Sequence, residues 1–366
     1  MEQAQLRIRA RRKFSNPQAM FFTRRGLEQA SGRRLAAYKA RRFARLSNVA
    51  DVCCGIGGDL IALSQRLNQE NFDTQSQAAD TELATHTIGV DNDELTCLFA
   101  ERNLLASSIP PGAAKTQQIE FSKFDLTELD GLHIDPDRRT EQRTVHGNRF
   151  SPNLQDVFAR VSPNFSVAVK VAPATPEADY FPVDLQREWI GDRRECKQQV
   201  LWYGPATDKP GHRTATYVGK GGTFSQVSVH EENLDQTVEI SESIHRYVYE
   251  PHPAVLAADL TDFLAHQNGL KRFSANIVYL TSKHPVDEPL LSRFEVMEVV
   301  PLSLKKVSEV LRSLNVGQVE IKKRGIETVT ASRYSRMRLE GPNSATVILT
   351  RFGRARVAVI AKRNKS

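Results

Sequence analysis

The sequence Asp51-Val52-Cys53-Cys54-Gly55-Ile56-Gly57-Gly58-Asp59 (DVCCGIGGD, residues 51–59) is the strongest indication of a fold in this chain of 366 residues. It lies within NVADVCCGIGGDLIALSQRL, which predicts a short apolar strand, a glycine turn and a helix. Gly55 and Gly57 allow a tight turn that brings backbone N–H groups close to a ligand. A dinucleotide fingerprint would need a third glycine at the position of Leu60, so that fingerprint is excluded.

On the C-terminal side of this turn, the chain alternates apolar runs with helical patterns. HTIGVDNDELTCLFAERNLLA (86–106) repeats the strand, turn and helix. Further strand-like runs follow at IEFSKFDL (119–126), LHIDPDRR (132–139), FSVAVKVAP (165–173), QQVLWYG (198–204) and TATYVG (214–219). Strands that alternate with helices predict a parallel sheet covered on both faces, which is a Rossmann-like α/β fold.

Composition changes divide the chain into three predicted parts. Residues 1–46 form a basic helical segment, residues 47–230 form the α/β domain, and residues 231–366 form a smaller α+β domain. A polar stretch at 68–86 predicts a surface insertion. The α+β domain ends in a hairpin that we expect to turn near Phe352 and Gly353.

The net charge of +7 is unevenly distributed. Residues 1–46 carry a net charge of +11 and residues 321–366 carry +10, whereas the residues between them carry −14. Such basic ends are typical of proteins that bind a polyanion, although the cations could simply be solvated surface. The candidate phosphate contacts are Arg7, Arg11, Arg12, Arg24, Arg25, Lys322, Lys323 and Arg324.

The glycine turn resembles motif I of class I S-adenosylmethionine-dependent methyltransferases, because an acid stands four residues before Gly55 in a G-x-G turn. That resemblance implies that Asp51 binds the cofactor ammonium and that Asp91, at the second strand end, binds the ribose hydroxyls. It also implies that Asp125 contacts the adenine amine. Each acid could instead be a helix N-cap or a turn residue.

The fourth predicted strand ends in an acceptor-site candidate. Asp135 and Pro136 fit the start of the [DNS]-P-P-[YFW] motif of nucleic-acid amino methyltransferases, but Asp137 and Arg138 replace the rest and no aromatic residue is near. Arg138 and its neighbour Arg139 could hold phosphate, stack on a base or pair with an adjacent acid. Lys170, inside an apolar strand, should face a cleft or form a buried ion pair.

The sequence indicates no catalytic thiol, no metal site and no membrane-spanning segment. The four cysteines show no CxxC spacing, and Cys53 and Cys54 are expected to pack within the turn. The nine histidines show no metal-ligand spacing, so we predict no metal. There is no run long and apolar enough for a membrane helix and no secretory signal, so a cytoplasmic location without membrane contact is expected.

The motifs together resemble a bacterial family of class I methyltransferases that end in a THUMP-like domain. The series includes MFFTRRGLEQASGRRLAAYKARRF, DVCCGIGGD, IGVDND, HIDPDRR, VAVKVAP, EWIGDRRECKQQVLWYG, EPHPAV, IKKRG and TVILTRFGRARVAVI, and it runs from about residue 14 to the end. THUMP domains proper bind RNA in tRNA-modifying enzymes, so structured RNA (tRNA or rRNA) is the implied partner. The first helices also resemble trimethylguanosine synthase relatives, which implies that Phe22 and Thr23 contribute to the cofactor pocket.

The resemblance thus implies S-adenosylmethionine as cofactor and an RNA methyltransferase as function. The predicted cofactor-binding residues are Phe22, Thr23, Asp51, Cys53, Gly55, Gly57, Gly58, Asp59, Asp91, Asn92 and Asp125. The predicted catalytic residues are Asp135, Pro136, Arg138 and Lys170. A methyltransferase of a protein or small molecule, or a non-catalytic RNA-binding protein with a cofactor pocket, stays open. The oligomeric state is open as well.

Overall fold

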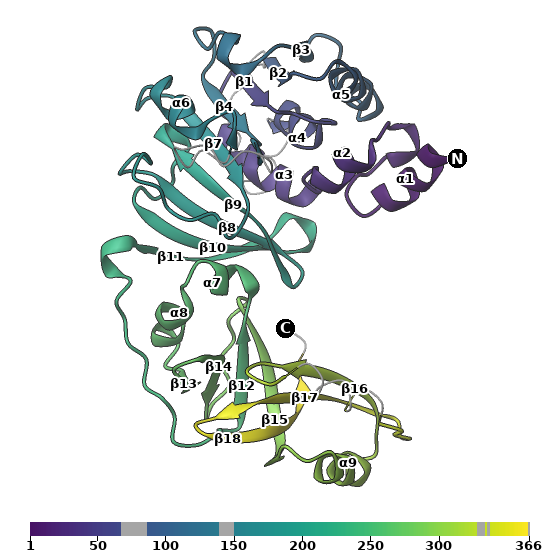
Figure 1. The fold of residues 1–366 in the computed structure, drawn as a ribbon, viewed down its shortest axis with the longest axis vertical. Helices are drawn as coiled ribbons and strands as arrows, with labels where there is room; N and C mark the ends of the chain where they lie inside the picture. Colours follow the sequence, from purple (N-terminus) through teal and green to yellow (C-terminus); the bar gives the residue numbers. More distant parts are fainter. Residues whose placement is uncertain (67–85, 139–149, 328–333, 335–336, 365–366) are drawn as a thin grey trace, which may run out of the picture. The chain divides into compact units, whose positions relative to one another are not determined.

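The computed structural model describes residues 1–66, 86–138, 150–327, 334 and 337–364, and the chain divides into two compact units (Figure 1). The first unit contains Met1–Arg193, Lys197–Thr214 and Val218–Phe224, and the second contains Arg194–Cys196, Ala215–Tyr217 and Ser225–Ser366. The helical segment before residue 47 therefore belongs to the same unit as the glycine turn. The predicted insertion at 68–86 lies outside the described residues, apart from His86.

A nine-stranded sheet forms the centre of the α/β part, in the order β11-β10-β8-β9-β7-β4-β1-β2-β3. Its strands are β1 (Asn48–Val52), β2 (His86–Asp91), β3 (Ala114–Gln118), β4 (Gly131–Ile134), β7 (Ser166–Val171), β8 (Gln186–Asp192), β9 (Glu195–Tyr203), β10 (His212–Val218) and β11 (Phe224–His230). The strands β3, β2, β1, β4 and β7 are parallel neighbours, as predicted, whereas β9 runs antiparallel to β7.

Helices cover both faces of this sheet (Figure 1). The covering helices are α3 (Arg33–Ala40), α4 (Gly58–Ser64), α5 (Glu94–Ala106) and α6 (Leu154–Ala159), whereas α1 (Glu2–Ala10) and α2 (Arg24–Gln29) pack together in a separate apolar cluster. Side chains alternate along a strand, so Ala50 and Val52 of β1 join the apolar cluster that contains α6 residues, while Val49 joins the cluster of α3 and α4. Burial on both faces is what a central parallel strand requires.

The third strand differs from the prediction. The structure places β3 at Ala114–Gln118, and the run predicted as a strand contains a 3₁₀ turn at Phe121–Lys123. Phe121 and Phe124 are both buried, and their spacing of three residues suits one face of a 3₁₀ turn rather than of a strand. The strand itself is a polar edge strand, so it lacks an apolar signal.

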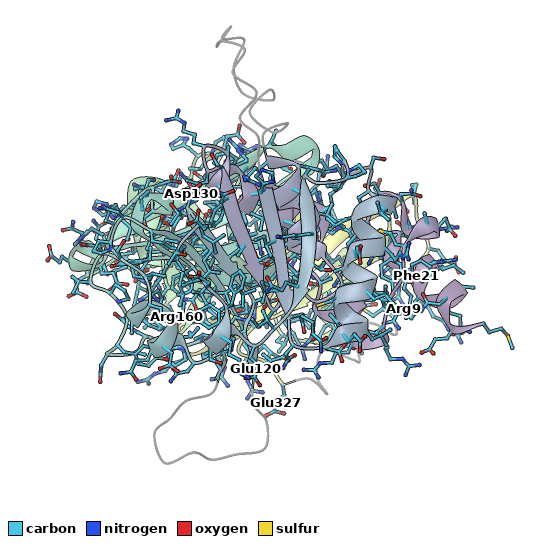
Figure 2. The ribbon with its side chains drawn as sticks, turned by 90° about the horizontal axis from the view of Figure 1, so that it is seen from above. Arg9, Phe21, Glu120, Asp130, Arg160 and Glu327 are labelled. Atoms are coloured by element: carbon cyan, nitrogen blue, oxygen red, sulfur yellow. The ribbon has the colours of Figure 1, made fainter. Side chains whose placement is uncertain are left out.

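The two ends of the parallel strands are marked in Figure 2. Asp130 lies at the amino edge, where its carboxylate accepts hydrogen bonds from the backbone of Ser47 (3.0 Å) and Asn48 (2.8 Å). Glu120 and Arg160 lie at the opposite edge. In open α/β sheets, ligands bind at this carboxyl edge.

The second unit contains a seven-stranded sheet in the order β13-β14-β12-β15-β18-β17-β16. Its elements are β12 (Tyr247–Pro251), α7 (Pro253–Ala257), α8 (Thr261–Gln267), β13 (Lys271–Ser274), β14 (Ile277–Ser282), β15 (Leu291–Pro301), α9 (Leu304–Ser313), β16 (Val316–Lys323), β17 (Asn343–Phe352) and β18 (Ala355–Arg363). The predicted hairpin is confirmed, because Phe352 pairs with Ala355 and Gly353 has a φ of 56° in the turn.

Two further short strands, β5 (Asp137–Arg138) and β6 (Phe150–Ser151), pair antiparallel beyond the end of β4. β5 comes directly after Asp135 and Pro136 in the chain, so this small pair of strands begins next to them.

Candidate cofactor and acceptor site

The glycine turn adopts the backbone geometry that its sequence predicts. Gly55 and Gly57 have φ values of 55° and 88°, and Gly57 is the N-cap of α4. A side chain is strained at such angles, which explains the glycines. A Cβ added at Gly55 would meet nothing within 4 Å, so there is open space beside the turn. A Cβ at Gly58 would lie 3.3 Å from the backbone N of Ser31, so this end of the turn packs closely against the N-terminal segment.

Asp91 lies beside the turn at the end of β2. Its Oδ2 accepts a hydrogen bond from the Gly55 N–H at 3.1 Å, and its Oδ1 accepts one from the Asp93 N–H at 3.1 Å. Partial burial raises the pKa of Asp91 above its ordinary value, although these N–H groups oppose the rise. Each oxygen keeps a free lone pair, so this carboxylate can accept two hydroxyl groups. Asn92 follows it and is exposed.

Asp51 and Asp59 lie beneath the turn, in a buried polar group. The Oδ1 of Asp51 lies 2.7 Å from Nδ1 of His133, and Nε2 of His133 lies 3.0 Å from the Lys39 ammonium. Lys39 also pairs with Asp59 at 2.8 Å, and Ser31 donates to Asp59 at 2.7 Å. Asp51 is 0% exposed and Asp59 is 7% exposed. Their predicted contacts with the cofactor stay predictions.

The ionisation of this group follows from burial and charge. Burial raises the pKa of Asp51 despite the opposing effect of His133. Burial alone would also raise the pKa of Asp59, but the Lys39 ammonium holds it well below its ordinary value. Burial lowers the pKa of Lys39, against the pull of Asp59. Lys39 and Asp59 therefore form an ion pair within the protein interior.

Cys53 directly follows β1 and begins the turn, with a φ of 56°. Its Sγ lies 3.9 Å from the carbonyl oxygen of Ser151, and burial raises the pKa of the thiol strongly. A protonated and largely buried thiol is a poor nucleophile, which agrees with the packing role expected from the sequence.

Phe22 and Thr23 are brought to the turn by a close helix contact. Phe22 is 1% exposed and packs in one apolar cluster with Ile56 of the turn. Thr23 is the N-cap of α2, where its Oγ1 accepts a hydrogen bond from the Gly26 N–H at 2.9 Å. Asn103 of α5 secures the segment, because its amide donates to the carbonyl oxygens of Phe21 (3.0 Å) and Ile56 (2.9 Å).

Asp125 does not join the turn through any contact between described residues. It is exposed, and its carboxylate accepts hydrogen bonds from the N–H and the hydroxyl of Thr127, each at 3.0 Å. These bonds lower the pKa of Asp125. The geometry is that of the alternative interpretation, a turn residue, and its adenine contact stays a prediction.

The acceptor edge is built around an ion pair at the ends of β4 and β7. The Lys170 ammonium lies 2.5 Å from Oδ2 of Asp135 and donates to the carbonyl oxygen of Gln29 at 3.1 Å. Burial alone would lower the pKa of Lys170, but the Asp135 carboxylate more than compensates and the pKa is raised. Pro136 is buried directly after Asp135.

Helix α2 extends over the same edge. Arg25 donates to both oxygens of Asp137 at 3.0 Å, and Gln29 donates to Asp137 at 3.3 Å. Asp137 thus pairs with Arg25 of α2. The backbone of Arg138 pairs with Phe150, while its side chain and Arg139 lie outside the part of the chain that the structure describes.

Sequence reasoning missed the residues that connect these parts, above all Lys39, His133 and Gln29. Strand alternation carries a usable signal, because His133 stands two residues before Asp135 and so faces the same side of the sheet. Helical spacing carries another, because Lys39 follows the buried Leu35 by four residues.

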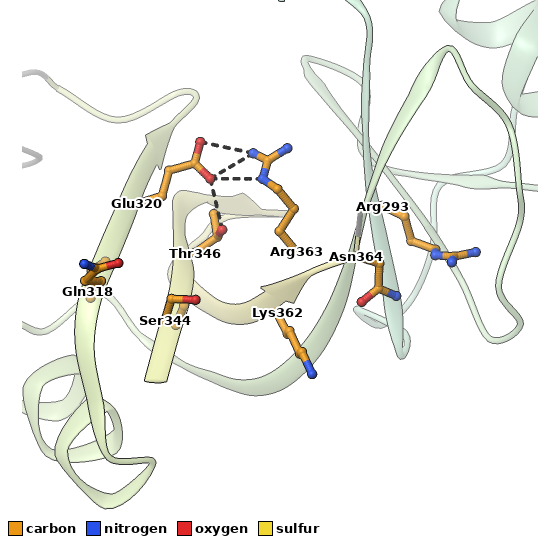
Figure 3. Close-up of a pocket in the computed structure, with 10 residues that line it drawn as sticks. Arg293, Gln318, Glu320, Ser344, Thr346, Lys362, Arg363 and Asn364 are labelled. Carbon is orange, nitrogen blue, oxygen red and sulfur yellow. Dashed lines mark hydrogen bonds and ion pairs between the residues drawn. The ribbon is translucent and has the colours of Figure 1, made fainter. Parts of the chain in front are cut away.

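The second unit has a hollow of about 1020 Å³ against β16, β17 and β18 (Figure 3). Glu320 pairs with Arg363 at 2.8 Å and accepts a hydrogen bond from Thr346 at 3.1 Å. Arg293 and Lys362 add two more cations to the lining. The hollow is therefore mixed in charge but holds more cations than acids.

The predicted phosphate contacts differ in their surroundings. Arg7 donates to the carbonyl oxygen of Met20, and Lys322 pairs with Glu250 at 2.5 Å. Arg11, Arg12 and Arg24 are exposed and have no ion pair with any described residue. The role of all of them in binding stays a prediction.

The described part of the chain contains neither a metal site nor a membrane-spanning helix. Among the residues that the structure describes, no group of three or more His, Cys, Asp or Glu side chains could hold a metal ion. No described helix is long and apolar enough to cross a membrane.

Known proteins share this fold. Residues 291–363 match the family model described as THUMP domain-like. A protein of Mycobacterium tuberculosis (strains CDC 1551 / Oshkosh and H37Rv), named an uncharacterized S-adenosylmethionine-dependent methyltransferase, is 27% identical over 335 residues, which are 91% of this chain and 85% of that protein. The crystal structure of a proposed methyltransferase from Porphyromonas gingivalis W83 matches with a TM-score of 0.74 and 21% identity, over 100% of this chain and 89% of that one. The predicted Rossmann-like α/β fold with a C-terminal THUMP-like domain is confirmed.

Proposed function

We propose that this protein is an S-adenosylmethionine-dependent methyltransferase that acts on structured RNA. The observation that carries the first part is the glycine turn at the carboxyl edge of the parallel sheet, with the Gly55 N–H bound to Asp91 at 3.1 Å. The name of the mycobacterial relative supports the same cofactor and reaction.

The residues present fit this cofactor. There is open space beside Gly55, which any larger side chain at this position would occupy. The two carboxylate oxygens of Asp91 can each accept a hydrogen bond from a ribose hydroxyl. When bound, S-adenosylmethionine supplies a methyl group on a positively charged sulfur, which is already activated for transfer. The protein then has to align a nucleophile with that methyl group and stabilise the charge that develops.

The acceptor edge supports a positioning role for Asp135. Lys170 pairs with this carboxylate at 2.5 Å and fixes its position, so Asp135 can accept a hydrogen bond from an N–H or O–H of the acceptor. Arg25 is held on Asp137 by two hydrogen bonds and borders the same edge. No dedicated general base is needed, because the donor is activated before the reaction.

RNA is the substrate that the THUMP-like domain and the basic ends support. Domains of this kind are associated with RNA, and exposed arginines such as Arg11 and Arg24 are suited to phosphate contacts. A location in the cytoplasm, where structured RNA is abundant, is part of the same proposal.

The test uses extracts of a deletion strain and its parent, incubated with the purified protein and methyl-tritiated S-adenosylmethionine. RNA, DNA, protein and small-molecule fractions are then counted, with Asp91→Ala as the inactive control. We expect label in RNA from the deletion strain alone, and none with Asp91→Ala. Label confined to protein or small molecules would contradict the RNA substrate. Binding of cofactor and RNA without any label would identify a non-catalytic protein.

A further inference from the structure

The buried group beneath the glycine turn has an unusual composition. Lys39 is 1% exposed, and Asp51 and His133 are each 0% exposed. A lysine is almost never buried to this extent unless it is paired, and removing one member of a buried pair is strongly destabilising. Neither the acceptor edge nor the contact between Gly55 and Asp91 uses these residues, so their burial calls for another explanation.

The hydrogen bonds fix the protonation of His133. Its Nε2 faces the Lys39 ammonium at 3.0 Å, and an ammonium can only donate, so Nε2 accepts and carries no proton. The proton is therefore on Nδ1, which donates to Asp51 at 2.7 Å. A single directed path of hydrogen bonds thus leads from α3, through β4, to β1.

The same lysine also holds the other side of the turn. Asp51 comes just before the turn, and Asp59 comes just after it in the first turn of α4. Lys39 binds Asp59 directly at 2.8 Å and reaches Asp51 through His133. Both ends of the turn are therefore attached to one ammonium group.

Direct contact of these acids with a ligand is disfavoured by their burial. The two carboxylates are 0% and 7% exposed, whereas Asp91, which faces the open side of the turn, is partly exposed. Strand alternation explains the difference, since Asp51 and His133 are paired neighbours on the face of the sheet that α3 covers.

We propose that Lys39 is a positioning residue for the cofactor turn, which it holds from beneath through Asp59 on one side and through His133 and Asp51 on the other. Asp51 and Asp59 then act on the cofactor through the backbone of the turn, rather than as the ligands that the sequence suggests. This inference rests on the proposed function, because it assumes that the turn binds the adenosyl cofactor. It also gives the N-terminal helical segment a second role, as part of the cofactor site.

The test measures S-adenosylhomocysteine binding by calorimetry with the full chain and its Lys39→Met, Asp59→Asn and doubly substituted variants. We expect each single change to raise Kd by about tenfold, since small displacements of a preorganised site have effects of this order. The double variant should bind S-adenosylhomocysteine no more weakly than the single variant with the higher Kd, because both changes remove the same ion pair. It also removes both buried charges and so guards against simple misfolding.

Arg42→Met is the matched control. Arg42 also comes from the N-terminal segment and forms a buried pair with Glu188 at 3.0 Å, away from the turn. We expect Arg42→Met to lower Tm by a similar amount and to leave Kd within about twofold of the wild-type value. Equal effects of Lys39→Met and Arg42→Met on Kd would reduce Lys39 to a stabilising residue and overturn the proposal.

Amide hydrogen exchange gives a readout that needs no ligand. The N–H groups of Gly55 and Gly57 are bonded within the turn, to Asp91 and to the Cys54 carbonyl oxygen. Lys39→Met should speed exchange at residues 54–58, and Arg42→Met should not. If the wild-type protein fails to bind S-adenosylhomocysteine, the proposed function is wrong, and unchanged exchange in Lys39→Met would separately refute the positioning role.

Discussion

At the scale of single residues, Asp91 and Asp93 allow a sharp comparison, because they stand two positions apart and have different tasks. Asp93 is the N-cap of α5 and accepts a hydrogen bond from the Thr96 N–H at 2.7 Å, whereas Asp91 faces the glycine turn. We expect Asp91→Ala to raise Kd for S-adenosylhomocysteine by about tenfold or more, through the loss of hydrogen bonds to a charged group. Asp93→Ala should cost about 1 kcal/mol of stability with little change in Kd. Equal losses of affinity, measured by calorimetry, would contradict the role of Asp91.

Lys170 gives a prediction about pH. Its pKa is raised above the ordinary 10.5, because the pull of Asp135 outweighs burial. The stability that the pair contributes is therefore fully present below the unfolded-state value and is lost as pH rises through the higher folded-state value. Lys170→Met should cost about 1 to 3 kcal/mol, by the same amount at every pH from about 6 to about 9. Thermal unfolding across this range checks it, and a difference that shrinks toward pH 9 would show that the ammonium titrates earlier.

The residues of the site differ in how well the sequence predicts them. Gly55 and Asp91 are predictable, because the turn and the following strand end are local patterns that specify geometry. Asp51 is recognisable as an acid beside the turn, but its burial is not, since its partner His133 is 82 residues away. Lys39 looks like one of many cations in a basic segment, and only the packing of α3 shows that it is internal. Long-range partners of this kind leave no pattern in a single sequence.

At the scale of elements, the contact of α2 with the glycine turn can be tested by one methyl group. A Cβ at Gly26 would lie 2.6 Å from Cγ2 of Ile56, whereas the nearest atom to a Cβ at Gly32 is Cγ of Lys13 at 4.0 Å. Gly26→Ala should therefore destabilise the protein by about 1 to 3 kcal/mol through overpacking and should weaken cofactor binding. Gly32→Ala, at the N-cap of α3, should cost less than about 1 kcal/mol and leave Kd unchanged. Denaturant unfolding measures the loss of stability in each variant. Similar losses for Gly26→Ala and Gly32→Ala would mean that α2 can shift to accommodate the added methyl group.

The elements themselves were predictable where burial leaves a pattern. The apolar runs of β1, β4 and β7 follow from their place in the middle of the sheet, where both faces are covered. β3 was misplaced because it is an edge strand of sequence AKTQQ, whose side chains face solvent. β12 was not predicted, although its Val248 and Tyr249 are both 0% exposed, because its five residues run directly into the helix α7.

At the scale of the whole molecule, the formal charge of the N-terminal segment overstates the charge that is free to bind a partner. Lys39 pairs with Asp59, Arg34 pairs with Asp192 at 2.5 Å, and Arg42 pairs with Glu188. These cations are paired and at least partly buried within the first unit, whereas Arg11, Arg12 and Arg24 remain exposed. A count of charges along the sequence cannot separate the two groups, because each acidic partner stands far away in the chain. The polyanion hypothesis therefore depends on the exposed set.

The contribution of the exposed arginines to RNA binding can be tested through its salt dependence. Cations that contact phosphates release bound counterions, so the affinity for RNA should fall steeply with salt. Replacing Arg11, Arg12 and Arg24 by Gln removes three exposed cations and should make the slope of log affinity against log salt shallower by about two to three. The matched control replaces Arg102, Lys115 and Lys123 by Gln, which changes the net charge equally but lies outside the basic segments. Titration of labelled tRNA at several salt concentrations measures both slopes. Equal slopes for the two triple variants would mean that only net charge matters, and a flat salt dependence of the wild-type protein would remove the case for an RNA partner at these residues.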